Sequence, residues 1–299
     1  MKVFVTGASG FVAGAVIPEL LKSGHQVVAL ARSDEAEQKI KKLSSDIEIV
    51  IGGLQDLEVL KETAARSDGV IHLGFIHDFS KFEESCLIDR EATVTMLDAI
   101  KGTNKPYVQT SGTLMLPPGT VATETSEKLT SGMGALRAQT EDIVLSYKDK
   151  GVRALAVRLP PTVHGKSDKG FMATFINVAK NSGKSAFIGD GANVWPAVSR
   201  WDAGRVYKLA LEKGRTGKAY HAVGEQGVET KDIAGAIGQL LVVPTEPIEA
   251  AKAPEHFGFL ATLFGLHAPV SSKLTREELG WEPKELDLVD DIVKNYETI

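Results

Sequence analysis

A short apolar run leads straight into a glycine-rich turn within the first 13 residues, "MKVFVTGASGFVA". Gly7 and Gly10 are three residues apart, and Ala13 takes the next position in that spacing. One glycine permits a sharp turn, a second lets the backbone approach a pyrophosphate, and a small third residue lets helix and strand pack closely. The start of the next helix offers unpaired N–H groups to a phosphate. The motif therefore predicts a dinucleotide site, although a glycine turn that only connects two elements is the alternative. We expect the cofactor to contact Gly7, Ser9, Gly10, Phe11 and Val12.

The same strand-then-helix pattern continues through the first half of the chain. Strands are expected at "KVFVTG", "HQVVALA", "IEIVIGG", "GVIHLG", "PYVQTS" and "VRALAVRL", with helices near 11–23, 34–43, 56–67, 78–100 and 133–150. Continuous apolar strands separated by helices are typical of a parallel sheet covered on both faces. This predicts a Rossmann-type doubly wound α/β domain over residues 1–160. Residues 161–299 are predicted to form mainly a smaller substrate-binding lobe, with some segments returning to the first domain.

Composition narrows the classes of partner. The chain has 299 residues, of which 43% are hydrophobic and 24% charged, so a full core is expected. A net charge of −5 without a long basic run argues against nucleic acid and acidic membranes. A single cysteine, Cys86, excludes an intramolecular disulfide and a metal cluster built from thiols, and no metal site is expected. No leader and no apolar run of about 18 residues is seen, so a cytoplasmic location is expected.

The end of the second expected strand bears on the choice of cofactor. An NAD site usually has Asp or Glu about 20 residues past the glycine turn, where it holds the ribose hydroxyls. This chain has Ala31, Arg32 and Ser33 there. A guanidinium and a hydroxyl suit a 2′-phosphate, which a carboxylate would repel. We therefore predict NADP(H), with Arg32 and Ser33 as ligands. The alternative is a solvated surface arginine.

Six motifs occur in an order that resembles the extended short-chain dehydrogenase/reductases, the family of nucleotide-sugar epimerases, dihydroflavonol reductases and hydroxysteroid dehydrogenases. They are "TGASGFVA", "GGLQD", "VIHLGF", "VRLPPTVHG", "WPAVSRWDAG" and "LTREELGWEP", and they span nearly the whole chain. In "GGLQD", Gly53 stands where the family usually has an Asp that meets the adenine, which leaves Leu54 for that contact. The resemblance implies further cofactor contacts from Leu73, Gly74, Phe75 and Pro160.

The stretch "TSGMGALRAQTE", residues 130–141, departs from the family at its centre. Counting back from Glu141 places Met133 and Arg137 where the family has its catalytic Tyr and Lys, so the chain is similar to the atypical branch that lacks this pair. Met133 has no proton to give, and the guanidinium of Arg137 stays charged near pH 7. We expect Arg137 to hold the nicotinamide ribose and to stabilise an oxyanion. The alternative is a surface arginine paired with Glu141.

Several other residues are candidates for substrate contact or proton transfer. His77 is the preferred proton donor, and Asp78 beside it is expected to raise its pKa and to contact substrate. Asp78 as a helix cap is the alternative. His164 is a second candidate for both roles. Ser111 and Thr113, which flank Gly112, are expected to bind a substrate oxygen or to satisfy the strand end.

Trp195 is expected to line the substrate pocket, or else to belong to the core. The favoured function is an NADP(H)-dependent oxidoreductase that reduces a carbonyl of a small molecule. A non-catalytic NADP(H)-binding sensor is the alternative, and an epimerase or dehydratase is a weaker third. By analogy with the family, a homodimer would pair through the helices near residues 80–100 and 133–150.

Overall fold

The computed structural model describes residues 1–296, apart from the side chains of Phe79 and Met133. Its largest element is a seven-stranded parallel sheet in the order β10-β6-β5-β4-β1-β2-β3. This confirms the predicted doubly wound α/β class. The strands are β1 (Lys2–Thr6), β2 (Gln26–Ala31), β3 (Glu48–Ile51), β4 (Gly69–His72), β5 (Pro106–Gly112), β6 (Arg153–Leu159) and β10 (Ala219–His221).

The strand order reverses between β1 and β4, since the chain crosses the sheet after β3. Val5 of β1 lies opposite Ala29 of β2 on one side and Ile71 of β4 on the other. In open α/β sheets, ligands bind outside the carboxyl ends of the strands at such a reversal. The topology therefore places the expected cofactor site where "TGASG" follows β1.

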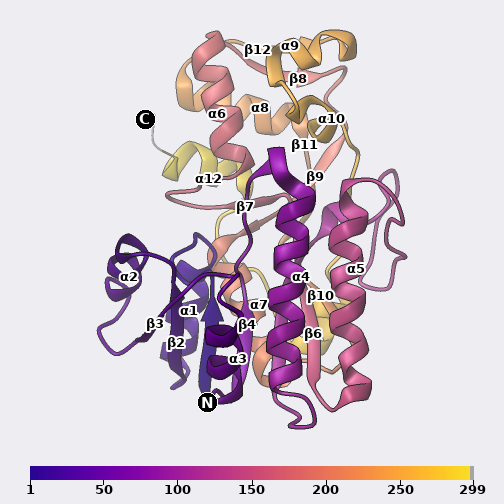
Figure 1. Cartoon of the computed structure of the whole chain (residues 1–299). Coiled ribbons are helices and arrows are strands. Elements are labelled where there is room, and N and C mark those ends of the chain that lie inside the picture. The colour runs from indigo at the N-terminus through magenta and orange to yellow at the C-terminus, as the bar shows by residue number, and fades with distance from the viewer. Residues whose placement is uncertain (297–299) are drawn as a thin grey trace.

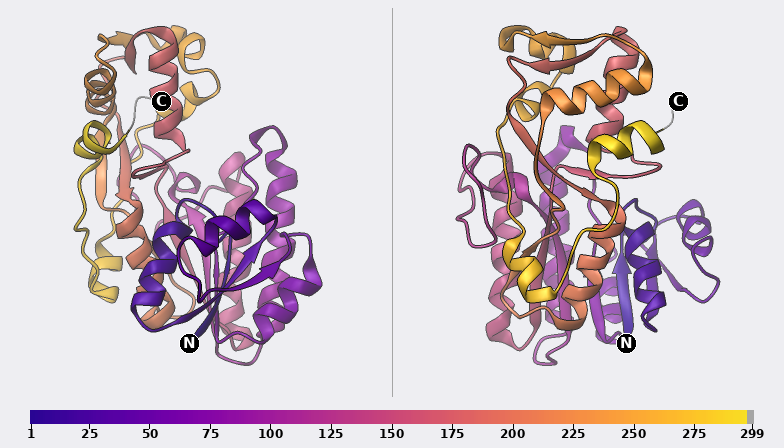
Figure 2. Two further views of the ribbon diagram at one scale, coloured as in Figure 1. Left: turned by 90° about the vertical axis from the view of Figure 1, so that its left-hand side faces the viewer. Right: turned by 180° about the vertical axis from the view of Figure 1, so that it is seen from behind.

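Helices cover both faces of the sheet (Figure 1). Alternate strand residues face the two layers. Phe4 packs under the layer of α3 and α4, whereas Val3 and Val5 pack under α1 and α7. Figure 2 shows α7 beside α1 on the far side, and the two helices are in contact. The helices of these layers are α1 (Ala13–Lys22), α2 (Asp34–Lys41), α3 (Leu57–Ala65), α4 (Phe82–Ala99), α5 (Met133–Ser146), α7 (Arg200–Lys213) and α11 (Lys273–Leu279).

A smaller lobe lies beyond the carboxyl ends of the strands (Figure 1). Its core is aromatic, with the rings of Phe175 and Phe264 4.3 Å apart and that of Trp195 5.5 Å from Phe264. Its strands are β7 (Thr162–His164), β9 (Val194–Ser199) and β11 (Glu225–Glu229) in one sheet, and β8 (Ser185–Ile188) and β12 (Thr245–Ile248) in another. Its helices are α6 (Phe171–Ser182), α8 (Thr230–Leu241), α9 (Ala253–Phe257), α10 (Leu260–Phe264) and α12 (Leu288–Asn295).

Some helix boundaries differ from the predicted ones, because turns or 3₁₀ segments occupy residues that were expected to be α-helical. The first helix begins at Ala13 and not at Phe11, because a tight turn with a hydrogen bond from Gly10 N to Gly7 O comes first. The long stretch 78–100 divides into a 3₁₀ turn at 79–81 and α4, and α5 tightens into a 3₁₀ turn at 147–150.

The second half of the chain returns to the large sheet, through α7 and β10. A domain boundary at residue 160 stays a prediction. Among the described residues, no helix has both the length and the apolar character that crossing a bilayer requires.

Candidate functional site

The glycine turn brings the ends of β1 and β4 into backbone contact. Gly7 has φ +63°, and a Cβ added there would lie 2.7 Å from Gly74 N and 2.8 Å from the carbonyl carbon of Leu73. A side chain at Gly10 would lie 2.9 Å from the oxygen of Gly7. Only glycine fits at Gly7, since both the conformation and the space exclude a Cβ. The result is a narrow backbone cradle at the reversal of strand order.

The first turn of α1 faces this cradle without a side-chain cap. Val12 occupies the N-cap position and makes no side-chain hydrogen bond to the helix start. The first N–H groups of a helix have no partner within it, and they carry the positive end of its dipole. Ser9 is exposed, and Phe11 and Val12 are half-buried. These are the features expected of a phosphate-binding turn.

Few side chains are held in place where the adenosine part of the cofactor is expected to bind. Arg32 is exposed at the end of β2, while the hydroxyl of Ser33 caps α2 by accepting from Ala36 N at 3.3 Å. Leu54 lies against the cradle, with its Cδ2 3.0 Å from where a Cβ on Gly74 would be. One contributor was missed by the sequence analysis: Asp56 accepts a hydrogen bond of 2.6 Å from Gly53 N and thereby fixes the turn after β3.

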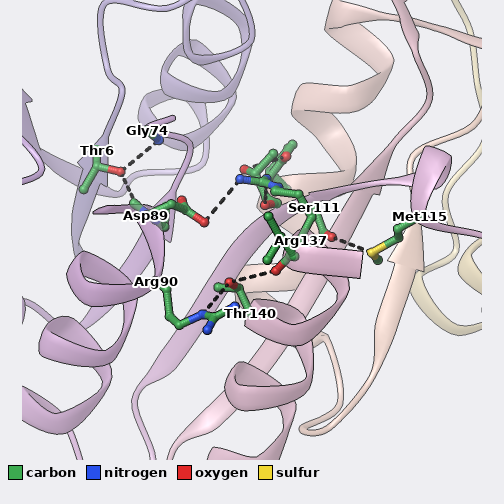
Figure 3. Close-up of polar contacts among 12 residues, drawn as sticks. Thr6, Gly74, Asp89, Arg90, Ser111, Met115, Arg137 and Thr140 are labelled. Atoms are coloured by element: carbon green, nitrogen blue, oxygen red, sulfur yellow. Dashed lines mark hydrogen bonds and ion pairs between the residues drawn. The ribbon is translucent and has the colours of Figure 1, made fainter. Parts of the chain in front are cut away.

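A buried chain of polar contacts connects the cradle to the helix that bears Arg137 (Figure 3). Thr6 Oγ1 accepts from Gly74 N at 3.1 Å and lies 2.6 Å from His72 Nδ1. His72 Nε2 is 3.2 Å from one oxygen of Asp89, and the other oxygen accepts from Arg137 at 3.2 Å. The chain passes from β1 through β4 and α4 to α5. None of Thr6, His72 and Asp89 was singled out from the sequence.

Arg137 is held on three sides. Its second donor bonds to the carbonyl oxygen of Thr110 at 2.8 Å, and its guanidinium lies over the ring of Phe75, 4.3 Å from the ring centre. Tyr207 of α7 donates to the hydroxyl of Thr110 at 2.9 Å, which supports the same strand end. The Arg137 side chain is 18% exposed. It is therefore a fixed cation at the carboxyl edge of the sheet, and it does not pair with Glu141, which bonds to Arg158 and Lys128 instead.

Met133 begins α5, four residues before Arg137. Its side chain lies outside the described part of the structure, so its expected place where the family has the catalytic Tyr stays a prediction. Nearby on β5, Ser111 is buried and donates to the sulfur of Met115 at 3.4 Å (Figure 3). Thr113 is also buried, but its hydroxyl has no hydrogen-bond partner among the described residues. Of the two, Thr113 retains the hydroxyl that a bound oxygen could engage.

His77 belongs to the same group as Arg137 through Phe75. Its ring lies edge-on to Phe75, with the ring centres 5.3 Å apart. Partial burial and, after it, the charge of Arg137 lower the pKa of His77, against a hydrogen bond with the Phe75 backbone. The expectation that Asp78 raises this pKa is wrong. The carboxylate of Asp78 turns away and caps the 3₁₀ turn by accepting from Ser80 N at 3.0 Å.

The structure does not bring His164 and Trp195 to this group. His164 is buried and its Nδ1 lies 2.6 Å from Asp291 of α12. Trp195 is fully buried in the core of the lobe, and its indole N–H donates to Leu263 O at 3.2 Å. Pro160 is buried at the end of β6. Trp195 therefore belongs to the core, which was the alternative to a pocket position. His164 forms a buried pair with Asp291 that the sequence did not indicate.

Comparisons with known proteins concern the family and the fold of the chain. The sequence profile of the NAD dependent epimerase/dehydratase family matches residues 3–223. An uncharacterized protein of Saccharomyces cerevisiae is 54% identical over 296 residues, 99% of each chain. A 4-hydroxy-2-methyl-3-oxo-4-farnesyl-3,4-dihydroquinoline-1-oxide ketoreductase of Stigmatella aurantiaca is 24% identical over 86% of this chain and 80% of its own.

The fold is shared with solved structures of low sequence identity. A dTDP-glucose 4,6-dehydratase of Streptomyces venezuelae, DesIV, solved with NAD and TYD bound, has a TM-score of 0.81 at 18% identity, over 99% of this chain and 95% of that one. The family profile covers most of the chain and includes both the glycine cradle and the strands that carry the Arg137 group. The chain therefore belongs to the NAD dependent epimerase/dehydratase family, whose members use nicotinamide cofactors.

Proposed function

We propose that the chain is an NADP(H)-dependent oxidoreductase that reduces a carbonyl group of a small molecule. The observation that carries the proposal is the fixed guanidinium of Arg137, joined to the glycine cradle through Asp89, His72 and Thr6. The cradle fits a dinucleotide, because a Cβ on Gly7 would fill it. The ketoreductase relative supports a reduction.

Arg32 supports the choice of NADP(H). It is exposed at the end of β2, where a carboxylate would favour the unphosphorylated ribose. Titration of the protein should give a lower Kd for NADPH than for NADH, and Arg32→Ala should erase the difference. Lys41→Ala, which removes a charge from the exposed side of the adjacent α2, is the matched control. Equal affinities in the native protein would contradict the assignment.

The roles of the chain's own residues follow from what each can donate. A bound NADPH supplies a hydride. Arg137 stabilises the negative charge that develops on a substrate oxygen, and because Asp89 already fixes it, it needs no reorganisation. Thr113, whose buried hydroxyl has no partner among the described residues, orients the carbonyl. Arg137 cannot release a proton near pH 7, so His77 or water supplies it.

A non-catalytic NADP(H)-binding sensor is the second candidate, and the lowered pKa of His77 favours it, since a neutral imidazole is a weak acid. Cofactor oxidation separates the two. Purified protein with NADPH and a panel of aldehydes, ketones and quinones should oxidise cofactor above background, and Arg137→Met should abolish that rate. Tight NADPH binding without turnover of any compound would favour the non-catalytic sensor over the oxidoreductase. An epimerase or dehydratase is the weaker third candidate, because it needs a base for its first step.

A further inference from the structure

Arg200, the first residue of α7, lies beside the opening turn of α1. Its guanidinium carbon is 5.0 Å from the centre of the Phe11 ring and 4.8 Å from that of Trp201. Its Nη1 is 4.0 Å from where a Cβ on Gly14 would be. Its stem passes Gly165, where an added Cβ would come within 3.3 Å of Cγ. Arg200 is thus enclosed by the glycine turn, the start of α1 and the loop after β7.

This guanidinium has no acceptor among the residues that the structure describes. Within the described part of the chain Arg200 makes no hydrogen bond or ion pair, and its Nε is buried without a partner. Arg205, one turn later on the same helix, also has a buried Nε without a partner among the described residues, but its two Nη atoms bond to Glu285 and Asp202. Burial lowers the pKa of Arg200, against the charge of Asp291, which is itself bonded to His164. Arg200 is half-buried, and buried polar groups are almost always hydrogen-bonded. The buried Nε and the two Nη groups, which have no partner among the described residues, are therefore suited to an acceptor that a ligand brings.

The nature of that acceptor follows from the neighbours. The start of α1 carries uncapped N–H groups and the positive end of a ten-residue helix. Arg200 adds a full positive charge to the same place, against Phe11 of the glycine turn. Two sources of positive charge that converge beside a turn too tight for a side chain suit a diphosphate. A nucleobase or a sugar ring carries no negative charge to match these two positive groups.

We propose that Arg200 binds the diphosphate of the dinucleotide from the α7 side, opposite the glycine turn. The proposal rests on the proposed binding of a pyridine dinucleotide. Arg200 directly follows Ser199 of β9, which pairs with His164 of β7. The cofactor ligand therefore stands at the start of α7, directly after the last strand residue that pairs within the lobe sheet.

Arg200 is proposed to bind the diphosphate, whereas Arg32 is proposed to bind the 2′-phosphate. The role of Arg200 can therefore be tested independently of the choice between NADP(H) and NAD(H). The diphosphate is common to NADPH and NADH, so Arg200→Met should weaken both about equally. A charge-assisted hydrogen bond contributes enough that we expect a Kd about 10- to 100-fold higher. ADP should lose affinity to a similar degree, whereas adenosine, which has no phosphate, should bind as before.

The test is a calorimetric titration of native protein, Arg200→Met and the matched control Arg205→Met with NADPH, NADH, ADP and adenosine. Arg200→Gln replaces Arg200→Met where circular dichroism shows the latter to be unfolded. A loss confined to the three phosphate-bearing ligands, and absent from Arg205→Met, supports the inference. Unchanged NADPH affinity, or an equal loss for adenosine, overturns it. Native protein that binds neither dinucleotide overturns the proposed function, and this inference with it.

Discussion

Replacement of Arg158 by Met should destabilise the protein, because it leaves the buried carboxylate of Glu141 without its main cationic partner. Arg158 of β6 is 3% exposed and Glu141 of α5 is fully buried. Their two hydrogen bonds measure 2.6 Å (Nη2 to Oε1) and 3.1 Å (Nε to Oε2). The remaining cation on Glu141 is Lys128, at 3.2 Å. Breaking a buried pair by removal of one partner costs about 3–5 kcal/mol, and we expect about 3 kcal/mol at pH 7 because Lys128 remains.

The loss should depend on pH with a definite sign. Burial raises the pKa of Glu141, but Arg158 and then Lys128 outweigh it and hold that pKa below its ordinary value. In the native protein the pair therefore contributes stability above the ordinary Glu pKa and loses it as the pH falls through the lowered value. Without Arg158, burial raises the Glu141 pKa, so protonation relieves the variant first. The difference in the free energy of unfolding between the native protein and Arg158→Met should decrease as the pH falls toward about 4.

His221 acts in the same direction. Its Nε2 lies 3.1 Å from Arg158 and its Nδ1 bonds to Ser271 O. Burial and then Arg158 lower the pKa of His221 to about 4. Removal of Arg158 lets this pKa rise, so that at mildly acidic pH a protonated His221 partly replaces the lost cation.

Urea denaturation followed by circular dichroism at several pH values measures the difference directly. The double variant Arg158→Met, Glu141→Gln is the control, because it removes the orphaned charge and should recover about 1 kcal/mol or more. A loss under about 1 kcal/mol at pH 7, or a difference that widens on acidification, would refute the reasoning.

Three further outcomes are expected from the site. His77→Asn should remove a rise in carbonyl reduction below about pH 6.5, since the native imidazole becomes an acid only below its ordinary pKa; a pH–rate profile that is identical in both proteins would count against His77. Gly7→Ala should abolish NADPH binding in a titration and lower the Tm, because its Cβ meets Gly74 N at 2.7 Å; normal binding would show that the cradle yields. Asp89→Asn should cost about 1–3 kcal/mol in urea denaturation, since Arg137 and His72 share that carboxylate; an unchanged midpoint would mean that the contacts contribute nothing.

Local patterns were enough to predict the first half of the fold. Strands buried on both faces read as continuous apolar runs, and glycine spacing marks the turn after β1. The strand β10, which returns to the sheet, could not be predicted from the sequence. It has three residues, Ala219–His221, too few to show the alternating pattern of a strand. Its place beside β6 depends on contacts with the rest of the fold.

Side-chain partners at the site were harder to predict for the same reason. Resemblance placed Arg137 correctly on α5, yet Asp89, which fixes it, is 48 residues away on a helix with no distinguishing motif. The partner of His164 is 127 residues away, so nothing near His164 indicated a buried pair. Thr6 and His72 carry polar groups in strands that otherwise read as core. In each case the residue type is visible in the sequence, whereas the contacts between distant residues depend on the fold.

The replacement at the centre of the site changes what a nearby cation can do for proton transfer. A positive charge favours the deprotonated form of any neighbouring acid. In the related enzymes that keep the Tyr–Lys pair, this effect moves a tyrosine pKa from about 10 toward neutrality, where a proton donor works best. Here the neighbour of the cation is His77, whose ordinary pKa is already near 6.5. Burial and, after it, Arg137 lower the pKa of His77, and so move it away from neutrality. The same charge that would stabilise a substrate oxygen therefore disfavours the imidazolium, and a reduction at this site should accelerate as the medium becomes more acidic.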